Sequence, residues 1–206
     1  MKDVRNYLAE LTAKRRAEQE SACRAFVLPA GFSLPRELEI AIENRWVIRP
    51  VLAESIFASP EAYVGVPSNQ RAQIEFWAAT NEGCSWALTT GPGSGVIAAE
   101  IDTHSGSEPL RELSSDDWTT LKQTLGFDAG HSWFALFAFA ENLRKVREHS
   151  PWLRIHAGDQ ILIPPSVRSG ERLFFRETSM RLADAPDWLR APSATGESQP
   201  LLTRIA

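Results

Sequence analysis

The chain has 206 residues, of which 43% are hydrophobic and 23% are charged. This composition is typical of globular proteins and excludes wholesale disorder, and the length suits one substantial domain with appendages. No apolar run approaches the roughly 18 residues of a membrane helix, and residues 1–5 do not open a signal peptide, so we expect a soluble, cytoplasmic protein. The two cysteines, Cys23 and Cys84, form neither a disulfide framework nor a zinc motif.

The overall charge is acidic, with 22 Lys and Arg residues against 26 Asp and Glu residues and a net charge of −4. A protein with this balance has no long-range attraction for nucleic acid, so any polyanion must bind a local patch. Segment 144–181 is the candidate, because its eight Lys and Arg residues exceed its Asp and Glu residues by four. The interspersed signs fit an ordinary solvated surface equally well.

Apolar periodicity and capping residues predict helices and strands that alternate along the chain. Helices are expected at 3–24, after Ser33, after Ser68, over 110–126 in two pieces that break near Ser114 and Ser115, and at 141–148. Strands are expected at 46–51, 84–90, 96–102, 132–139, 153–156, 160–163 and 172–175. We expect Pro50 to stop the first of these strands.

The alternation favours an α/β or α+β fold around a mixed sheet. We divide the chain into a peripheral N-terminal helix within 1–30, a folded domain over 31–190 and a flexible polar tail at 191–206. The turn GPGSG at 91–95 leads into a β-branched run and not a helix, which disfavours a phosphate-binding loop. The seven tryptophans could stack on bases, but most follow the apolar periodicity and are expected in the core.

The most pointed group of polar residues is Glu100 and Asp102, which flank Ile101 in an apolar strand. Side chains alternate along a strand, so both carboxylates leave the same face, about 7 Å apart. Such a pair can hold a hard divalent cation when phosphates supply further oxygens. A solvated strand end beside a turn explains the same pair equally well.

The order of motifs around this pair resembles the N-terminal domain of bifunctional DNA primase-polymerases, within the archaeo-eukaryotic primase superfamily. The resemblance runs from about Phe32 to Leu189. Its motifs are Arg45–Pro50, Ile74–Trp77, Trp86–Gly91, Ser94–Gly95, Glu100–Asp102 with Gly106, Ile161–Ser166 with Gly170, and Ala185–Leu189. The resemblance to this family rests on the ordered set of motifs and not on any single motif.

The resemblance implies a two-part fold, in which an RRM-like mixed sheet packed with helices lies beside a smaller α/β unit. It also implies metal-dependent nucleotidyl transfer in DNA replication, with Glu100 and Asp102 holding Mg²⁺ or Mn²⁺. Nucleic acid and nucleoside triphosphate are the implied partners. A helicase would have to act in trans, because the chain has no GxxxxGK[ST] loop.

The chain keeps the second acid of the family pattern as Asp102 but departs from the pattern at three other expected site residues. Glu100 stands where the family mostly has aspartate, Phe134 where it has a histidine, and Arg154 where it has a third acid. His131 could replace that histidine only if its strand shifted by three residues. A guanidinium cannot ligate a cation, so we expect Arg154 to pair with Glu100 and Asp102 in a metal-free site. A surface arginine that pairs with nothing is the other interpretation of Arg154.

We therefore carry three hypotheses. The first is a primase-polymerase-like nucleotidyltransferase domain that extends or initiates chains with metal and nucleoside triphosphate, with an eroded metal site and catalysis either kept or lost. The second is a non-catalytic module of the same fold that binds single-stranded nucleic acid or nucleotide, and the third is a protein-interaction remnant. Glu100, Asp102 and Arg154 are the candidate catalytic residues. The candidate contacts to nucleotide or nucleic acid are His131, Arg144, Arg147, His156, Ser166 and Arg172.

Overall fold

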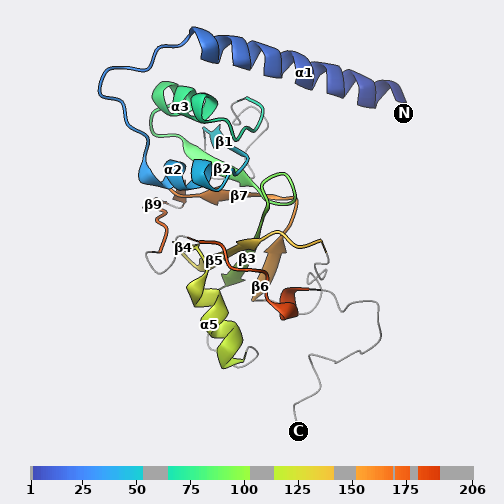
Figure 1. Cartoon of the computed structure of the whole chain (residues 1–206), viewed down its shortest axis with the longest axis vertical. Coiled ribbons are helices and arrows are strands. Elements are labelled where there is room, and N and C mark those ends of the chain that lie inside the picture. Colours follow the sequence, from blue (N-terminus) through green and yellow to red (C-terminus); the bar gives the residue numbers. More distant parts are fainter. Residues whose placement is uncertain are drawn as a thin grey trace.

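The computed structural model describes residues 2–52, 65–102, 114–141, 152–168, 170–176 and 181–190 (Figure 1). The described helices are α1 (Lys2–Ala25), α2 (Arg36–Glu43), α3 (Arg71–Thr80) and α5 (Ser115–Gln123), followed by a 3₁₀ turn at Asp187–Leu189. The described strands are β1 (Ile48–Val51), β2 (Ser85–Thr89), β3 (Val96–Asp102), β4 (Gly126–Ala129), β5 (Ser132–Ala138), β6 (Leu153–His156), β7 (Gln160–Ile163), β8 (Val167–Arg168) and β9 (Glu171–Arg172).

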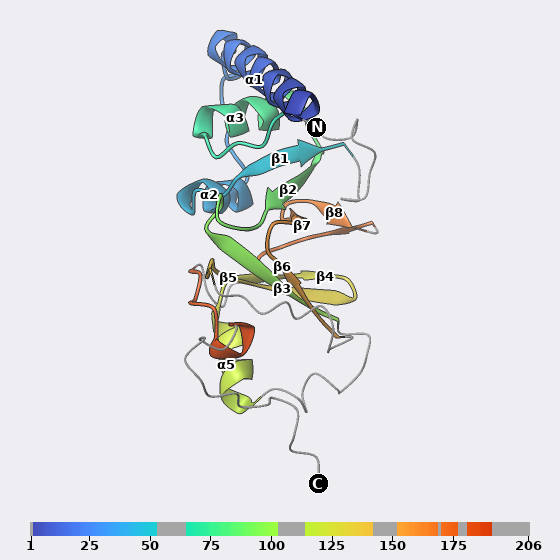
Figure 2. The same cartoon turned by 90° about the vertical axis from the view of Figure 1, so that its right-hand side faces the viewer.

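Two larger sheets, of order β1-β2-β7 and β4-β5-β3-β6, are accompanied by the short β8-β9 hairpin. The two sheets lie one above the other, with α1 and α3 beyond the first and α5 beyond the second (Figure 2). The expected α+β class is confirmed. Every ladder among the described strands is antiparallel, so the mixed sheet that we expected is replaced by antiparallel sheets.

The first strand shows why Pro50 does not act as a stop. β1 continues through Pro50, which lies opposite Trp86 of β2, and ends at Val51. β1 is an outer strand of its sheet, and its second edge is bonded at Ile48 to Ser68 by an isolated bridge that does not extend to Pro50. An edge strand tolerates the missing N–H of proline at such a position. The expectation of a stop at Pro50 was wrong for this reason.

Helix starts also differ from those expected. The N-cap of α2 is Pro35 and that of α3 is Gln70, neither with a side-chain capping bond, whereas Ser114 caps α5 in a capping box with Asp117. Ser68 does not cap α3 because its backbone pairs with Ile48 in a β-bridge.

Further along, a strand that was not expected, β4, begins at Gly126, the last residue of the expected helix. Of residues 172–175, only Arg172 belongs to a strand, and Phe175 forms an isolated bridge. The expected helix at 141–148 beyond Glu141, together with Arg144, Arg147 and the tail at 191–206, lies outside the described residues.

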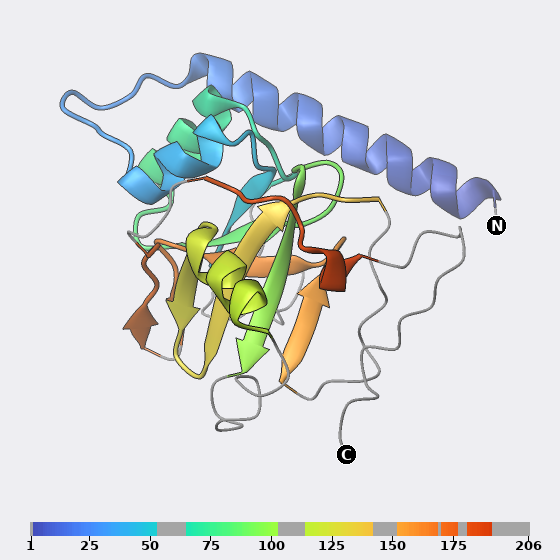
Figure 3. The same ribbon diagram turned by 60° about the horizontal axis from the view of Figure 1, so that its bottom comes forward.

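Two apolar clusters fill the body. The first lies between the two larger sheets and under α2 and α3, and includes Ile48, Trp77 and Ala98. The second packs α5 and the 3₁₀ turn against the outer face of the four-stranded sheet, where Figure 3 shows them side by side. Five of the seven tryptophans are at most 4% exposed, which confirms the expectation that most of them belong to the core.

Helix α1 lies along the edge of the body and extends past it at the N-terminal end (Figure 3). Its C-terminal part is anchored by Gln19, whose amide donates to the carbonyl of Val66 at 3.1 Å and accepts from the N–H of the same residue at 2.7 Å. Phe26, which follows the helix, packs edge-on against Phe76 with ring centroids 5.0 Å apart. These contacts hold α1 beside α3.

Candidate functional site

Strand β3 places Glu100 and Asp102 on the face that is turned toward the three-stranded sheet. Ala98, on the same face, belongs to the cluster between the sheets, whereas Ile97 and Ile101 belong to the cluster on the α5 side. The alternation along the strand therefore separates the two carboxylates from the outer core.

Three basic side chains converge on the Glu100 carboxylate. Its Oε2 accepts a hydrogen bond from Nε2 of His156 at 2.9 Å and lies 3.9 Å from Nη1 of Arg154. Its Oε1 lies 3.8 Å from Nη1 of Arg168. The register explains two of these contacts, since Arg154 lies directly opposite Glu100 across the β3–β6 ladder and His156 lies opposite Ala98.

The Glu100 side chain is 14% exposed, so its ionisation is set by its neighbours. Burial raises its pKa, but hydrogen bonds from His156 and Ser132 and the positive charges of His156 and Arg168 together outweigh that effect. The net result is a pKa below the ordinary value of a glutamate, and Glu100 is a carboxylate at neutral pH.

His156 is buried on the same face, and its other ring nitrogen, which forms no hydrogen bond among the described residues, faces a turn. Its Nδ1 lies 3.6 Å from Oδ2 of Asp159, in the turn between β6 and β7. Thr90 fixes this turn, because its hydroxyl accepts from the N–H groups of Gly158 and Asp159 and donates to the Asp159 carbonyl. The turn joins the two larger sheets at the site, since β6 belongs to one and β7 to the other.

Phe134 of β5 lies opposite Glu100 on the other side of β3. It stacks on Phe127 at 4.8 Å, and its ring centroid is 5.9 Å from that of His156. The structure therefore brings a histidine from β6 next to the position where the family resemblance leads us to expect a histidine on β5.

Three other sequence-predicted residues, His131, Ser166 and Arg172, lie in the described part of the chain and have other surroundings or partners. His131 lies in the turn between β4 and β5, outside the ladder, so the three-residue strand shift does not occur. Ser166 is fully buried, and its hydroxyl accepts from the N–H of Trp86 at 2.7 Å and donates to its carbonyl at 3.1 Å. Arg172, on β9, is 3.8 Å from Glu37 of α2.

Two contacts of Glu100 were not predicted from the sequence. Ser132 is two residues from Phe134 on the same strand face, so the motif Ser132-Trp133-Phe134 contained the signal for it. Arg168 belongs to the basic segment that the sequence singled out, but no spacing connects it to Glu100. Its position depends on how the chain turns after β7.

Within the residues that the structure describes, no three or more His, Cys, Asp or Glu side chains are grouped to hold a metal ion. No helix in the same ranges is long and apolar enough to cross a membrane.

The comparison with known proteins agrees with the motif order. A search of curated proteins finds no match. The sequence model of the family "Bifunctional DNA primase/polymerase, N-terminal" matches residues 17–188, which is most of the chain. At family level this indicates nucleotidyl transfer of the primase/polymerase kind and interaction with nucleic acid and nucleotide. On this match, together with the ordered motifs, the chain belongs to the family of N-terminal domains of bifunctional DNA primase/polymerases.

Proposed function

We propose that this domain binds single-stranded nucleic acid through exposed arginines beside Glu100 and that it does so without metal-dependent nucleotidyl transfer. The observation that carries the proposal is the set of basic groups around Glu100, with His156 at 2.9 Å, Arg168 at 3.8 Å and Arg154 at 3.9 Å.

These groups oppose the divalent cation that the family chemistry uses. Mg²⁺ takes oxygen ligands, and a guanidinium offers only donors and a positive charge. A cation at Glu100 would have to displace the His156 hydrogen bond and approach Arg154 and Arg168. The side chains around Glu100 therefore do not fit such an ion, and in this proposal the arginines take its place as partners of the carboxylate.

These two arginines, and Arg172 of β9, present positive charge to solvent. The side chains of Arg154, Arg168 and Arg172 are 62%, 40% and 53% exposed, whereas their partners Glu100 and Glu37 are only 14% and 16% exposed. A polyanion approaching either glutamate meets a more exposed guanidinium group first, because each paired carboxylate is largely buried. Phosphate contacts of this kind supply most of the affinity in sequence-independent binding.

Phe174 adds an exposed aromatic ring next to Arg172. It is 59% exposed, between the buried Leu173 and the partly buried Phe175, and the guanidinium of Arg172 lies 5.5 Å from its ring centroid. An exposed ring beside arginines is a platform on which bases stack, worth about 1–3 kcal/mol per base. We use the name arginine surface for two groups of residues: Arg154 and Arg168 beside Glu100, and Arg172 with Phe174, Arg172 leaving the opposite face of the β8-β9 hairpin from Arg168.

Arg144 and Arg147 extend the proposal from the sequence alone, since they lie outside the described residues. Any strand separation would come from a helicase on another chain. His156 is treated as the group that positions Glu100 and not as a phosphate contact, because its Nε2 is already bonded to the carboxylate.

The test is fluorescence anisotropy of labelled single-stranded DNA and RNA oligonucleotides, with EDTA and with Mg²⁺, over a range of salt concentrations. We expect salt-sensitive binding that is unchanged by EDTA. Arg168→Glu and Arg172→Glu should each weaken it by about tenfold, which corresponds to about 1.4 kcal/mol. Phe174→Ala should weaken it with the salt dependence unchanged. Arg15→Glu, an equal charge reversal on the exposed face of α1, is the control.

Primer extension with Mg²⁺ or Mn²⁺ tests the second function, a metal-dependent transferase, which the shared face of Glu100 and Asp102 and the family membership favour. Extension that Glu100→Gln abolishes would establish the transferase and refute the metal-free proposal. Oligonucleotide binding that EDTA removes would refute it as well.

A further inference from the structure

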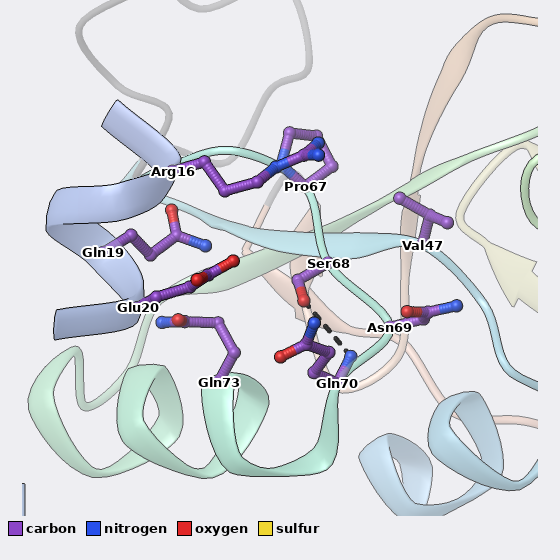
Figure 4. A pocket seen from close by; sticks show the side chains of 9 residues that line it. All are labelled: Arg16, Gln19, Glu20, Val47, Pro67, Ser68, Asn69, Gln70 and Gln73. Carbon is purple, nitrogen blue, oxygen red and sulfur yellow. Dashed lines mark hydrogen bonds between the residues drawn. The ribbon is translucent and has the colours of Figure 1, made fainter. Parts of the chain in front are cut away.

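A polar cavity lies between α1 and α3, away from Glu100 and its partners. It has a volume of about 290 Å³, is partly open to solvent, and lies between α1, the N-terminal end of α3 and residues 67–70 (Figure 4). Its polar lining includes Arg16, Gln19, Glu20, Asn69, Gln70 and Gln73. The volume is at the small end of the range for pockets that bind small molecules, about 300–1,000 Å³.

Gln73 is the unusual member of this lining. It is 3% exposed, and its Nε2 is buried without a hydrogen-bond partner among the described residues. Figure 4 shows its side chain rising from α3 toward α1, into the space between the two helices. A buried amide donor without a partner destabilises the folded state, so this N–H group is available to a ligand that carries an acceptor.

The wall opposite Gln73 is held in place. Gln19 uses both ends of its amide on the backbone of Val66. The preceding Gly65 has φ +68°, and a Cβ on it would lie 2.5 Å from Oε1 of Gln19 and 2.9 Å from Cζ2 of Trp77. The close approach at Gly65 therefore fixes α1 against the body, and the cavity is a built feature of the fold.

Two further groups define the chemistry of a ligand. Arg16 lines the cavity and forms neither a hydrogen bond nor an ion pair within the described part of the chain. Glu20 faces the same space, with its carboxylate 3.6 Å from Arg24. Asn69 and Gln70 supply more side-chain amides. The lining thus combines one cation, one carboxylate that is already 3.6 Å from Arg24, and amides that both donate and accept hydrogen bonds.

We propose that this cavity binds one nucleotide, with the phosphate on Arg16 and the base edge on the amide of Gln73. Side-chain amides pair with the donor and acceptor edge of adenine in two hydrogen bonds, so we name an adenine nucleotide as the ligand. Arginine is suited to a phosphate oxygen pair. The site shares no residue with the arginine surface, so it can be tested independently of the proposed function.

The experiment is calorimetric titration of the full chain with AMP, and with adenosine, CMP, GMP and UMP for comparison. We expect one AMP per chain, bound more tightly than the other three nucleotides. Gln73→Met keeps the length of the side chain and removes its amide. It should weaken AMP binding at least tenfold and raise the melting temperature of the free protein by about 2–4 °C, because the unpaired donor is gone. Gln123→Met, the same change at an exposed position of α5, should alter neither.

Arg16→Gln provides a second, exposed test that does not depend on repacking. It should remove the difference in affinity between AMP and adenosine, while Arg15→Gln should leave it unchanged. Nucleotide binding that Gln73→Met leaves intact and Arg168→Gln abolishes would place the ligand at the arginine surface and overturn the inference. Absence of saturable binding by all four nucleotides would overturn it too.

A nucleotide can reach the cavity free in solution or as part of a strand. Anisotropy with oligo(dA) and oligo(dT), on the parent and on Gln73→Met, separates these sources. A loss specific to oligo(dA) in the variant identifies a nucleotide within a strand. Equal binding of both oligonucleotides by parent and variant, with AMP binding lost in the variant, identifies the free nucleotide.

Discussion

Arg154→Asp is the substitution that tests most directly how Glu100 is used. Arg154 lies opposite Glu100 in the β3–β6 ladder, and its Nη1 is 3.9 Å from Oε2 of Glu100. Side chains at directly opposite positions of an antiparallel pair have Cβ atoms about 4.5–5.5 Å apart. The new carboxylate would therefore lie beside Glu100, on the face that also carries Asp102.

The magnitude follows from the distance and the exposure. Unit charges about 4 Å apart attract by about 1 kcal/mol in water and about 4 kcal/mol at an effective dielectric constant of about 20. Arg154 is 62% exposed, so the value near that of water applies, and exposed pairs measure about 0.2–1 kcal/mol. The substitution removes this attraction and adds a repulsion of similar size. We expect a loss of about 1–2 kcal/mol, or about 3–6 °C in melting temperature.

Mn²⁺ should recover that loss in Arg154→Asp and leave the parent unchanged, because an ion that binds only the folded state stabilises it by mass action. Thermal melting of both proteins with and without Mn²⁺ is the assay. Arg172→Asp is the matched control, since it reverses another exposed arginine next to a mostly buried glutamate, Glu37, away from Glu100. It should lose similar stability and gain no response to Mn²⁺. If Arg154→Asp melts like the parent and ignores Mn²⁺, Arg154 does not act on Glu100.

Three further predictions concern stability. The folded-state pKa of Glu100 is lowered, so its stabilising effect is present above the unfolded pKa of about 4.3 and is lost as the pH falls through the folded value. Glu100→Gln should thus melt lower at pH 7 and lose less on acidification toward pH ~3 than the parent; parallel melting curves would contradict this. Gly65→Ala, at φ +68° and against Gln19, should cost about 1–3 kcal/mol in urea unfolding, and a neutral effect would mean that the loop moves freely. Ser166→Ala leaves the buried N–H and carbonyl of Trp86 without their side-chain partner and should also cost about 1–3 kcal/mol; an unchanged urea midpoint would show that water replaces the hydroxyl.

Local sequence patterns predicted several elements to the residue. β3, β6 and β7 have the expected bounds, because each is a short apolar run between turn residues. The starts of α2 and α3 were not predicted, since the backbone of Ser68 is engaged by Ile48, twenty residues earlier in the chain. β4 was missed for a related reason: Gly126–Ala129 becomes a strand through its pairing with β5, and the alternation of Phe127, Asp128 and Ala129 is too short to predict a strand by itself.

For the candidate site too, part was predicted from the sequence and part depends on the tertiary structure. The alternation of side chains along β3 determines from the sequence alone that Glu100 and Asp102 share a face, and the motif order determines the family. The family resemblance led us to expect Arg154 beside Glu100. Only the tertiary structure decides that His156, from β6, and Arg168, from β8 beyond a further strand, meet the same carboxylate. Strand alternation is a local property of the backbone, whereas the partner of a charge depends on the register between distant strands and on the course of the turns between them. The same holds for Gln73, because a helix pattern can place an amide among apolar residues but only the packing of α1 on α3 leaves that amide without a partner.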